Sequence, residues 1–140
     1  MTSTIKNILI AEDDPVLREA YLRRFARTSF KVRTAENGEE AASMIKAQVP
    51  DLLICDIMMP VQDGIWVLEQ FPKDDRKFPV IMLTNFGDDA TRDRCKALGM
   101  DGYLVKKDMS LATLVEMAEN FVQKAPTITR PKAKAKVKKS

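Results

Sequence analysis

Five short apolar runs alternate along this chain with segments in which apolar residues recur every three or four positions. The apolar runs predict β-strands at 7–11, 31–35, 51–55, 78–84 and 101–106. The other segments predict helices from residue 15 onward and at 38–48, 65–71, 88–98 and 111–122. This alternation favours an α/β domain with a parallel sheet covered by helices on both faces.

Two of the expected strands differ in how they would be buried. Residues 52–55 are apolar at consecutive positions, as expected for a strand covered on both faces. Residues 31–35 alternate polar and apolar side chains, which predicts a strand at the edge of the sheet. The buried run leads directly into a carboxylate, Asp56, so we ask whether this acid begins a loop or carries chemistry.

The absence of histidine excludes several functions. A chain without histidine has no Ser-His-Asp or Cys-His catalysis, no histidine-ligated metal and no phosphohistidine of its own. With 140 residues it fits one folded domain, and it shows neither a secretory signal nor an apolar run long enough for a membrane span. Because Cys55 and Cys95 fall in or beside expected core elements, we expect a reduced, cytoplasmic protein without membrane association.

The formal net charge of +3 is unevenly distributed. Residues 124–140 contain seven basic residues and no acidic ones, which leaves 1–123 with a net charge of −4. We therefore expect a folded acidic domain at 1–123 and a flexible basic tail at 124–140, rich in lysine, alanine and proline. Nucleic-acid binding by this tail is not favoured, because no aromatic residue is interleaved with its lysines.

Polar side chains with chemical capability follow four of the five expected strands. Glu12 and Asp13 end the first strand, Asp56 the third, Thr84 the fourth and Lys106 the fifth. The carboxyl ends of parallel strands share one edge of a sheet, where ligands bind. Carboxylates that meet there need a cation, and an all-oxygen ligand set favours Mg²⁺.

This constellation fits phosphoryl transfer. An ionised Asp56 can accept a phosphoryl group as a mixed anhydride, while Thr84 and Lys106 hold the non-bridging oxygens. Simpler interpretations stay open: Asp56 as a loop acid, Glu12 and Asp13 as solvated charges before a helix, and Lys106 as a surface lysine. We expect Asp14 to act only as the N-cap of the helix that begins at Pro15.

The stretches "ILIAEDD", "LLICDIMMP", "VIMLT" and "GYLVK" resemble, in this order, the receiver domain of bacterial two-component response regulators. The resemblance covers residues 5–123 and implies a flavodoxin-like three-layer sandwich with strand order 2-1-3-4-5. It implies phosphorylation of Asp56, with Mg²⁺ bound directly by Asp13, largely through water by Glu12, and by the backbone carbonyl of Met58. It also implies switch roles for Thr84, Lys106 and Tyr103.

The chain departs from the family pattern at several positions. Lys107 stands where a proline usually follows the lysine, so the usual cis peptide bond at this position is in question. Asn85 replaces a small residue after Thr84 and would crowd access to a phosphoryl group. Met58 and Phe86 occupy positions that in the family affect how water reaches the phosphoaspartate, so the resemblance implies an altered dephosphorylation rate.

These observations favour a single-domain response regulator rather than an enzyme that acts on external substrates. A histidine kinase or phosphotransfer protein would donate the phosphoryl group. Output would pass to a downstream protein, or to a phosphorylation-dependent dimer, through the face formed by 88–98, 101–106 and 111–122. One alternative is a receiver-like scaffold that is never phosphorylated. A Mg²⁺-dependent phosphohydrolase is disfavoured, because Met58 stands where such enzymes commonly carry a second acid.

Overall fold

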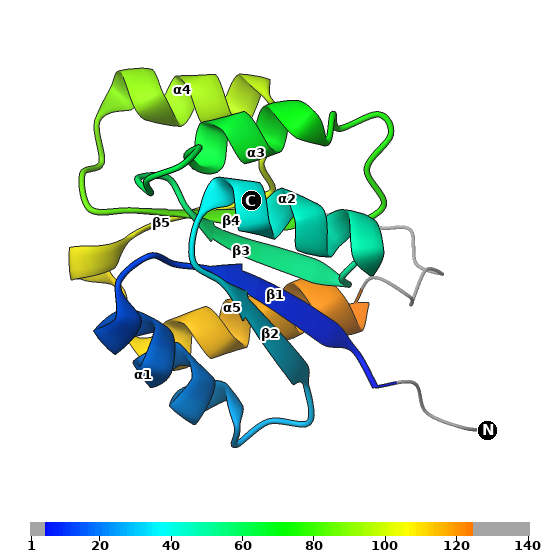
Figure 1. Ribbon diagram of the computed structural model, residues 1–140. Coiled ribbons are helices and arrows are strands. Elements are labelled where there is room, and N and C mark those ends of the chain that lie inside the picture. Colours follow the sequence, from blue (N-terminus) through cyan, green and yellow to red (C-terminus); the bar gives the residue numbers. More distant parts are fainter. Residues whose placement is uncertain (1–4, 125–140) are drawn as a thin grey trace.

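The computed structural model of this protein describes residues 5–124. Its centre is a parallel five-stranded sheet in the order β2-β1-β3-β4-β5 (Figure 1). The strands are β1 (Asn7–Ala11), β2 (Lys31–Ala35), β3 (Leu52–Asp56), β4 (Val80–Thr84) and β5 (Gly102–Val105). The expected strand order is confirmed.

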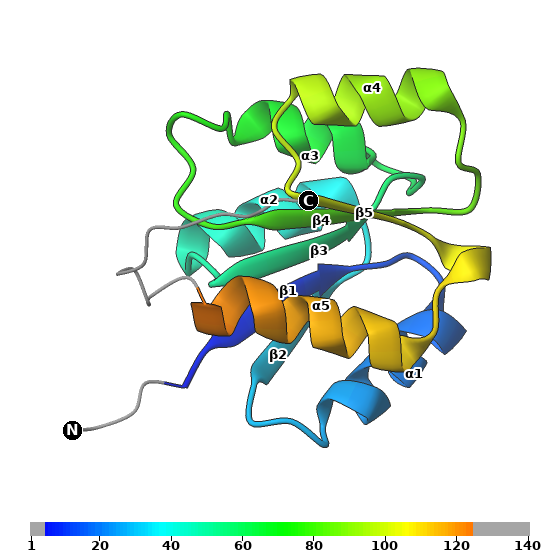
Figure 2. The same cartoon turned by 180° about the vertical axis from the view of Figure 1, so that it is seen from behind.

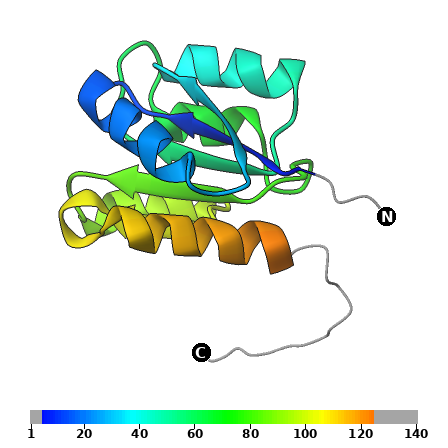
Figure 3. The ribbon, with the colours of Figure 1, turned by 90° about the horizontal axis from the view of Figure 1, so that it is seen from below.

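Five helices and one short 3₁₀ helix connect and cover the strands. They are α1 (Pro15–Phe25), α2 (Gly38–Ala47), α3 (Gly64–Gln70), α4 (Asp89–Ala97), η1 (Lys106–Asp108) and α5 (Leu111–Lys124). Helices α2, α3 and α4 lie on one side of the sheet, and α1 and α5 lie on the other (Figures 1 and 2). Seen from below, α1 and α5 share the same face of the sheet (Figure 3). The expected three-layer α/β sandwich is confirmed.

The bounds of the elements differ from expectation by one or two residues, for local reasons. β3 includes Asp56, which is in register with Leu83 of β4. β4 begins after Pro79, which has no N–H to donate to a sheet. β5 ends before Lys106, where the chain turns into η1. α5 extends to Lys124, and the tail expected beyond it lies outside the described residues.

The core lies on both faces of the sheet. All five residues of β3 and of β4 are buried, which explains why their apolar positions run consecutively. One cluster fills the space under α2, α3 and α4, and a second fills the space under α1 and α5. β2 is half-buried along most of its length, as expected for an edge strand. Within residues 5–124 no helix is long and apolar enough to cross a membrane.

Side chains cap the N-termini of four helices, each of which follows a strand in the chain. The carboxylate of Asp14 accepts the N–H of Val16 at 2.9 Å, and the amide oxygen of Asn37 accepts the N–H of Glu40 at 2.8 Å. Asp63 and Asp88 cap α3 and α4 in the same way. The N-termini of these helices therefore surround the carboxyl edge of the sheet.

The loop between β3 and α3 contains unusual backbone angles. Val61 and Gln62 have φ values of 50° and 77°, which a β-branched residue such as Val61 rarely adopts. Their carbonyls accept hydrogen bonds from the N–H groups of Glu39 and Gly38 at the start of α2. A Cβ at Gly38 would lie 2.3 Å from the Gln62 carbonyl oxygen, so this close approach requires glycine. The strained loop is thus held against α2.

Candidate functional site

Three carboxylates converge at the carboxyl edge of the sheet. Glu12 and Asp13 follow β1, and Asp56 ends the neighbouring strand β3. Each side chain places one oxygen within 4.8 Å of an oxygen of the other two. Glu12 and Asp56 are buried, whereas Asp13 is exposed. The three acids expected to meet at this edge do meet.

Lys106 joins two of these acids. Its Nζ atom donates to Glu12 Oε1 and to Asp56 Oδ2, both at 2.9 Å. The lysine enters from η1, directly after β5, and its side chain is only 11% exposed. It therefore supplies one buried positive charge to a cluster of three carboxylates. The Lys106–Lys107 peptide bond is trans.

Burial and the neighbouring charges shift the pKa values of these three side chains. Burial raises the pKa of Glu12 to about 7, although the hydrogen bond from Lys106 opposes this shift. Burial also raises the pKa of Asp56, again against the effect of Lys106. Burial alone would lower the pKa of Lys106, but its hydrogen bonds to Glu12 and Asp56 raise it to about 12. Lys106 therefore stays charged, and its single positive charge offsets only part of the negative charge of the three carboxylates.

The backbone after β1 is fixed by an arginine that the sequence analysis missed. Arg18 Nη1 donates to the carbonyls of Glu12 at 2.9 Å and Asp13 at 3.4 Å. The N–H of Glu12 donates to the Ala35 carbonyl at 3.0 Å. Arg18 lies one turn after the N-cap Asp14, which is the only sequence signal for this role.

The backbone around Asp56 is equally constrained. The N–H of Ile57 donates to the Leu83 carbonyl at 2.8 Å, and the N–H of Gly64 donates to the Ile57 carbonyl at 2.8 Å. A Cβ at Gly64 would lie 2.4 Å from the Asp56 carbonyl oxygen. Glycine at this position therefore allows α3 to start directly against the strand that carries Asp56.

Two of the three expected switch residues, Thr84 and Tyr103, have side chains that are engaged elsewhere than with the carboxylates. The Thr84 hydroxyl donates to the Phe86 carbonyl at 2.9 Å and accepts the Phe86 N–H at 3.1 Å. Tyr103 packs against the core under α3 and α4, and the Arg92 guanidinium lies 5.7 Å from the centre of its ring. Within residues 5–124 neither side chain hydrogen-bonds to Glu12, Asp13 or Asp56.

An open depression of about 370 Å³ adjoins the acidic cluster. It is lined by Asp13, Met58, Met59, Pro60 and Asp63. The exposed side chains of Met58 and Phe86 follow β3 and β4 at this same edge. A ligand bound to the acids would therefore have apolar as well as charged neighbours.

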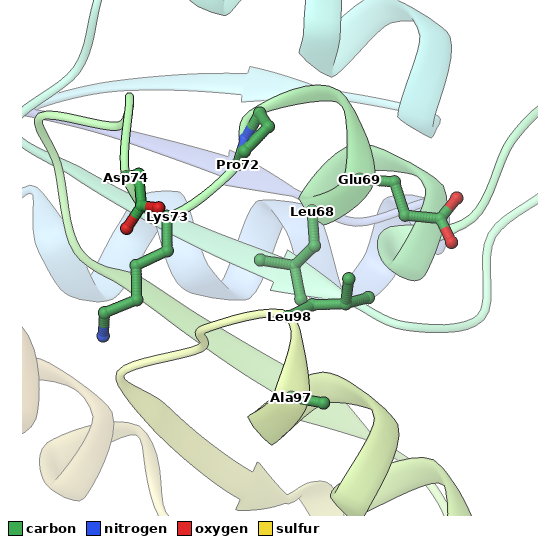
Figure 4. Close-up of a pocket in the computed structure, with 7 residues that line it drawn as sticks. All are labelled: Leu68, Glu69, Pro72, Lys73, Asp74, Ala97 and Leu98. Atoms are coloured by element: carbon green, nitrogen blue, oxygen red, sulfur yellow. The ribbon is translucent and has the colours of Figure 1, made fainter.

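A second hollow lies at the opposite edge of the sheet, between the ends of α3 and α4 (Figure 4). Its volume is about 450 Å³, and the side chains of Leu68 and Leu98 lie together in it. Glu69, Lys73 and Asp74 stand at its margin. None of the carboxylates of the acidic cluster lines it, so its larger volume does not make it the candidate site.

Comparisons with known proteins agree with this geometry. The family of response regulator receiver domains matches residues 8–119. The chain is 40% identical over 103 residues to a "Probable transcriptional regulator ycf27" of Guillardia theta, covering 74% of this chain and 40% of that protein. It is 34% identical over 102 residues to the "Chemotaxis protein CheY" of Halobacterium salinarum, covering 72% of this chain and 84% of that protein.

Solved structures show the same fold. A LuxR-family DNA-binding response regulator from Staphylococcus aureus aligns with a TM-score of 0.78 and 28% identity, over 84% of this chain and 98% of that one. A CheY-like receiver domain from Methanospirillum hungatei aligns with a TM-score of 0.82 at 22% identity, over 89% and 98% of the two chains. The chain spans only about two fifths of the length of the ycf27 relatives it matches.

The fold and the site define a class of signalling domain, in which a parallel α/β sandwich presents acids and one lysine at the carboxyl edge of its sheet. The chain belongs to the response regulator receiver domain family, the regulatory component of two-component systems.

Proposed function

We propose that this protein accepts a phosphoryl group on Asp56 in a Mg²⁺-dependent reaction. The observation that carries the proposal is the contact of Lys106 Nζ with Asp56 Oδ2 and Glu12 Oε1, beside an Asp13 oxygen within 4.8 Å of the other two acids. Asp13, Asp56 and the Met58 carbonyl would hold Mg²⁺, with Glu12 acting largely through water. These donors are all oxygen atoms, which Mg²⁺ prefers.

The residues of the chain divide the work of the reaction. An Asp56 oxygen forms a bond to phosphorus while the phosphorus–nitrogen bond of a phosphohistidine on the donor protein breaks. The electron pair of that bond returns to the imidazole nitrogen. Lys106 is long enough to turn from Asp56 to a non-bridging phosphoryl oxygen and to keep its positive charge there. Bound Mg²⁺ would neutralise the charge of the carboxylates and of the incoming phosphoryl group.

The phosphoryl group would come from a phosphohistidine on a histidine kinase or a phosphotransfer protein, because these 140 residues contain no histidine of their own.

Two side chains would carry the signal onward. Thr84 must release the Phe86 carbonyl before its hydroxyl can donate to a phosphoryl oxygen. Tyr103 would then be repositioned, changing the face of α4, β5 and α5 that contacts a downstream protein or a second copy of the chain. The transcriptional and chemotaxis regulators among its relatives support this regulatory role.

The test is the intact mass of the protein after incubation with acetyl phosphate and Mg²⁺. We expect a single phosphoryl adduct that disappears in Asp56→Asn and is not formed in EDTA. Asp74→Asn is the matched control, because Asp74 is an exposed acid at the opposite edge. Absence of an adduct on the folded wild-type protein would contradict phosphorylation and favour an unphosphorylated scaffold. Rapid turnover of external phosphoesters would contradict the regulatory role and favour a hydrolase.

A further inference from the structure

A second polar group lies buried on the α1 side of the acidic cluster. Tyr21, in the middle of α1, is 1% exposed, and its hydroxyl has no hydrogen-bond partner within residues 5–124. Tyr21 belongs to a core cluster that is otherwise formed by apolar side chains of α1, β1, β3, β4 and α5. A buried hydroxyl without a partner costs about 1–3 kcal/mol, whereas phenylalanine would fill the same space without this cost.

Tyr21 lies on the helix that begins beside the phosphorylation site. Long side chains on a helix lean toward its N-terminus, and α1 begins at the edge that carries Glu12. Burial raises the pKa of Tyr21 to about 12, with a further contribution from the charge of Glu12. Lys106 and Asp56 also affect this group. The hydroxyl therefore keeps its proton and is available as a donor.

Glu12 loses one hydrogen-bond donor when the site changes state as proposed. In the structure its Oε1 accepts from Lys106, and its Oε2 accepts the N–H of Asp14 at 3.1 Å. When Lys106 turns toward a phosphoryl group, Glu12 Oε1 loses the hydrogen bond that it now accepts. Glu12 is 1% exposed, so bulk water does not readily replace that donor.

We propose that Tyr21 is a positioning residue of the phosphorylation site, whose hydroxyl donates to the Glu12 side chain, directly or through one water, once Lys106 has turned toward the phosphoryl group. This inference rests on the proposed function. It explains why a hydroxyl that weakens the resting state is present: its hydrogen bond is formed in the phosphorylated state. Tyr21 does not touch the reacting atoms, and it acts through Glu12.

The test compares wild-type protein with Tyr21→Phe in two states. In EDTA, urea unfolding should show that Tyr21→Phe is at least as stable as wild type. With Mg²⁺ and beryllofluoride, which mimics the phosphoryl group, calorimetric titration should show affinity reduced about tenfold. A group that only packs in the core would not lower affinity while leaving stability intact.

Phe25→Leu is the matched packing control, because Phe25 is buried in the same cluster one turn further along α1. It should lower stability in EDTA without changing the intrinsic affinity for beryllofluoride. If Tyr21→Phe binds beryllofluoride as tightly as wild type, the role of Tyr21 is wrong and phosphorylation of Asp56 stands. If wild type itself binds no beryllofluoride, both proposals fail.

Discussion

The Nζ atom of Lys106 lies 2.9 Å from Oδ2 of Asp56, a residue 50 positions earlier in the chain. The contact exists because β3 and β5 both end at the carboxyl edge, on either side of β4. In the resting protein Lys106 neutralises part of the acidic cluster. In the proposed reaction it would stabilise the incoming phosphoryl group.

Replacement of Lys106 by alanine should destabilise the metal-free protein by about 3–5 kcal/mol, since it leaves Glu12 and Asp56 buried without their cation. Mg²⁺ should recover part of this loss by supplying positive charge. Urea unfolding in EDTA and in Mg²⁺ measures both effects. Lys107→Ala, at the exposed neighbouring position, should change stability by no more than about 0.5 kcal/mol. Equal effects of the two substitutions would contradict this assignment.

The metal-free protein should lose stability as the pH rises. Folding raises the pKa of Glu12 from 4.5 to about 7, so the folded state binds this proton more tightly than the unfolded state. The free energy of unfolding in EDTA should therefore fall by roughly 3 kcal/mol between pH 4.5 and pH 7. Glu12→Gln should flatten this dependence in denaturant titrations. A wild-type profile that rises over the same interval would show that the carboxylate is stabilised by folding.

The strained loop after Asp56 should become more stable when Val61 is replaced by asparagine. Val61 has a φ of 50°, a conformation that asparagine tolerates better than a β-branched residue. We expect a gain of about 1 kcal/mol in the free energy of unfolding. Val49→Asn provides the control, because Val49 is about as exposed and its φ is not positive. A similar gain in both variants would show that the removal of an exposed apolar side chain, and not the relief of backbone strain, causes the effect.

The contact between Arg92 and Tyr103 should hold the tyrosine ring in its resting position. The guanidinium lies 5.7 Å from the ring centre, a geometry worth about 0.5–1 kcal/mol at a partly exposed site. Arg92→Ala should lower stability by that amount and increase the mobility of the ring in NMR relaxation measurements. An unchanged Tyr103 ring signal would show that packing alone positions this side chain.

Much of the fold could be predicted from the sequence, because its patterns are local. The consecutive apolar residues of β3 indicated a strand covered on both sides, and Asp14 marked the start of the helix that it does cap. The convergence of Glu12, Asp13, Asp56 and Lys106 followed from parallel topology alone. The roles of Met58 and Tyr103 came only from the family resemblance and stay predictions.

Other features depend on contacts that no local pattern encodes. The hydroxyl of Thr84 turns to Phe86 because the loop after β4 offers both a donor and an acceptor there. The positive φ of Val61 and Gln62 is imposed by docking of their carbonyls on the start of α2, and neither residue type indicates it. The role of Arg18 depends on its guanidinium reaching back along the chain to the Glu12 carbonyl, a contact that no local pattern indicates.

The most direct measurement is a crystal structure of the protein with Mg²⁺ and beryllofluoride. We predict a metal ion coordinated by Asp13, Asp56 and the Met58 carbonyl, beryllofluoride bonded to an Asp56 oxygen, and Lys106 Nζ turned from the carboxylate to a fluorine atom. An unmodified Asp56 that keeps its contact with Lys106, with no metal among the acids at saturating ligand, would contradict the proposed phosphorylation.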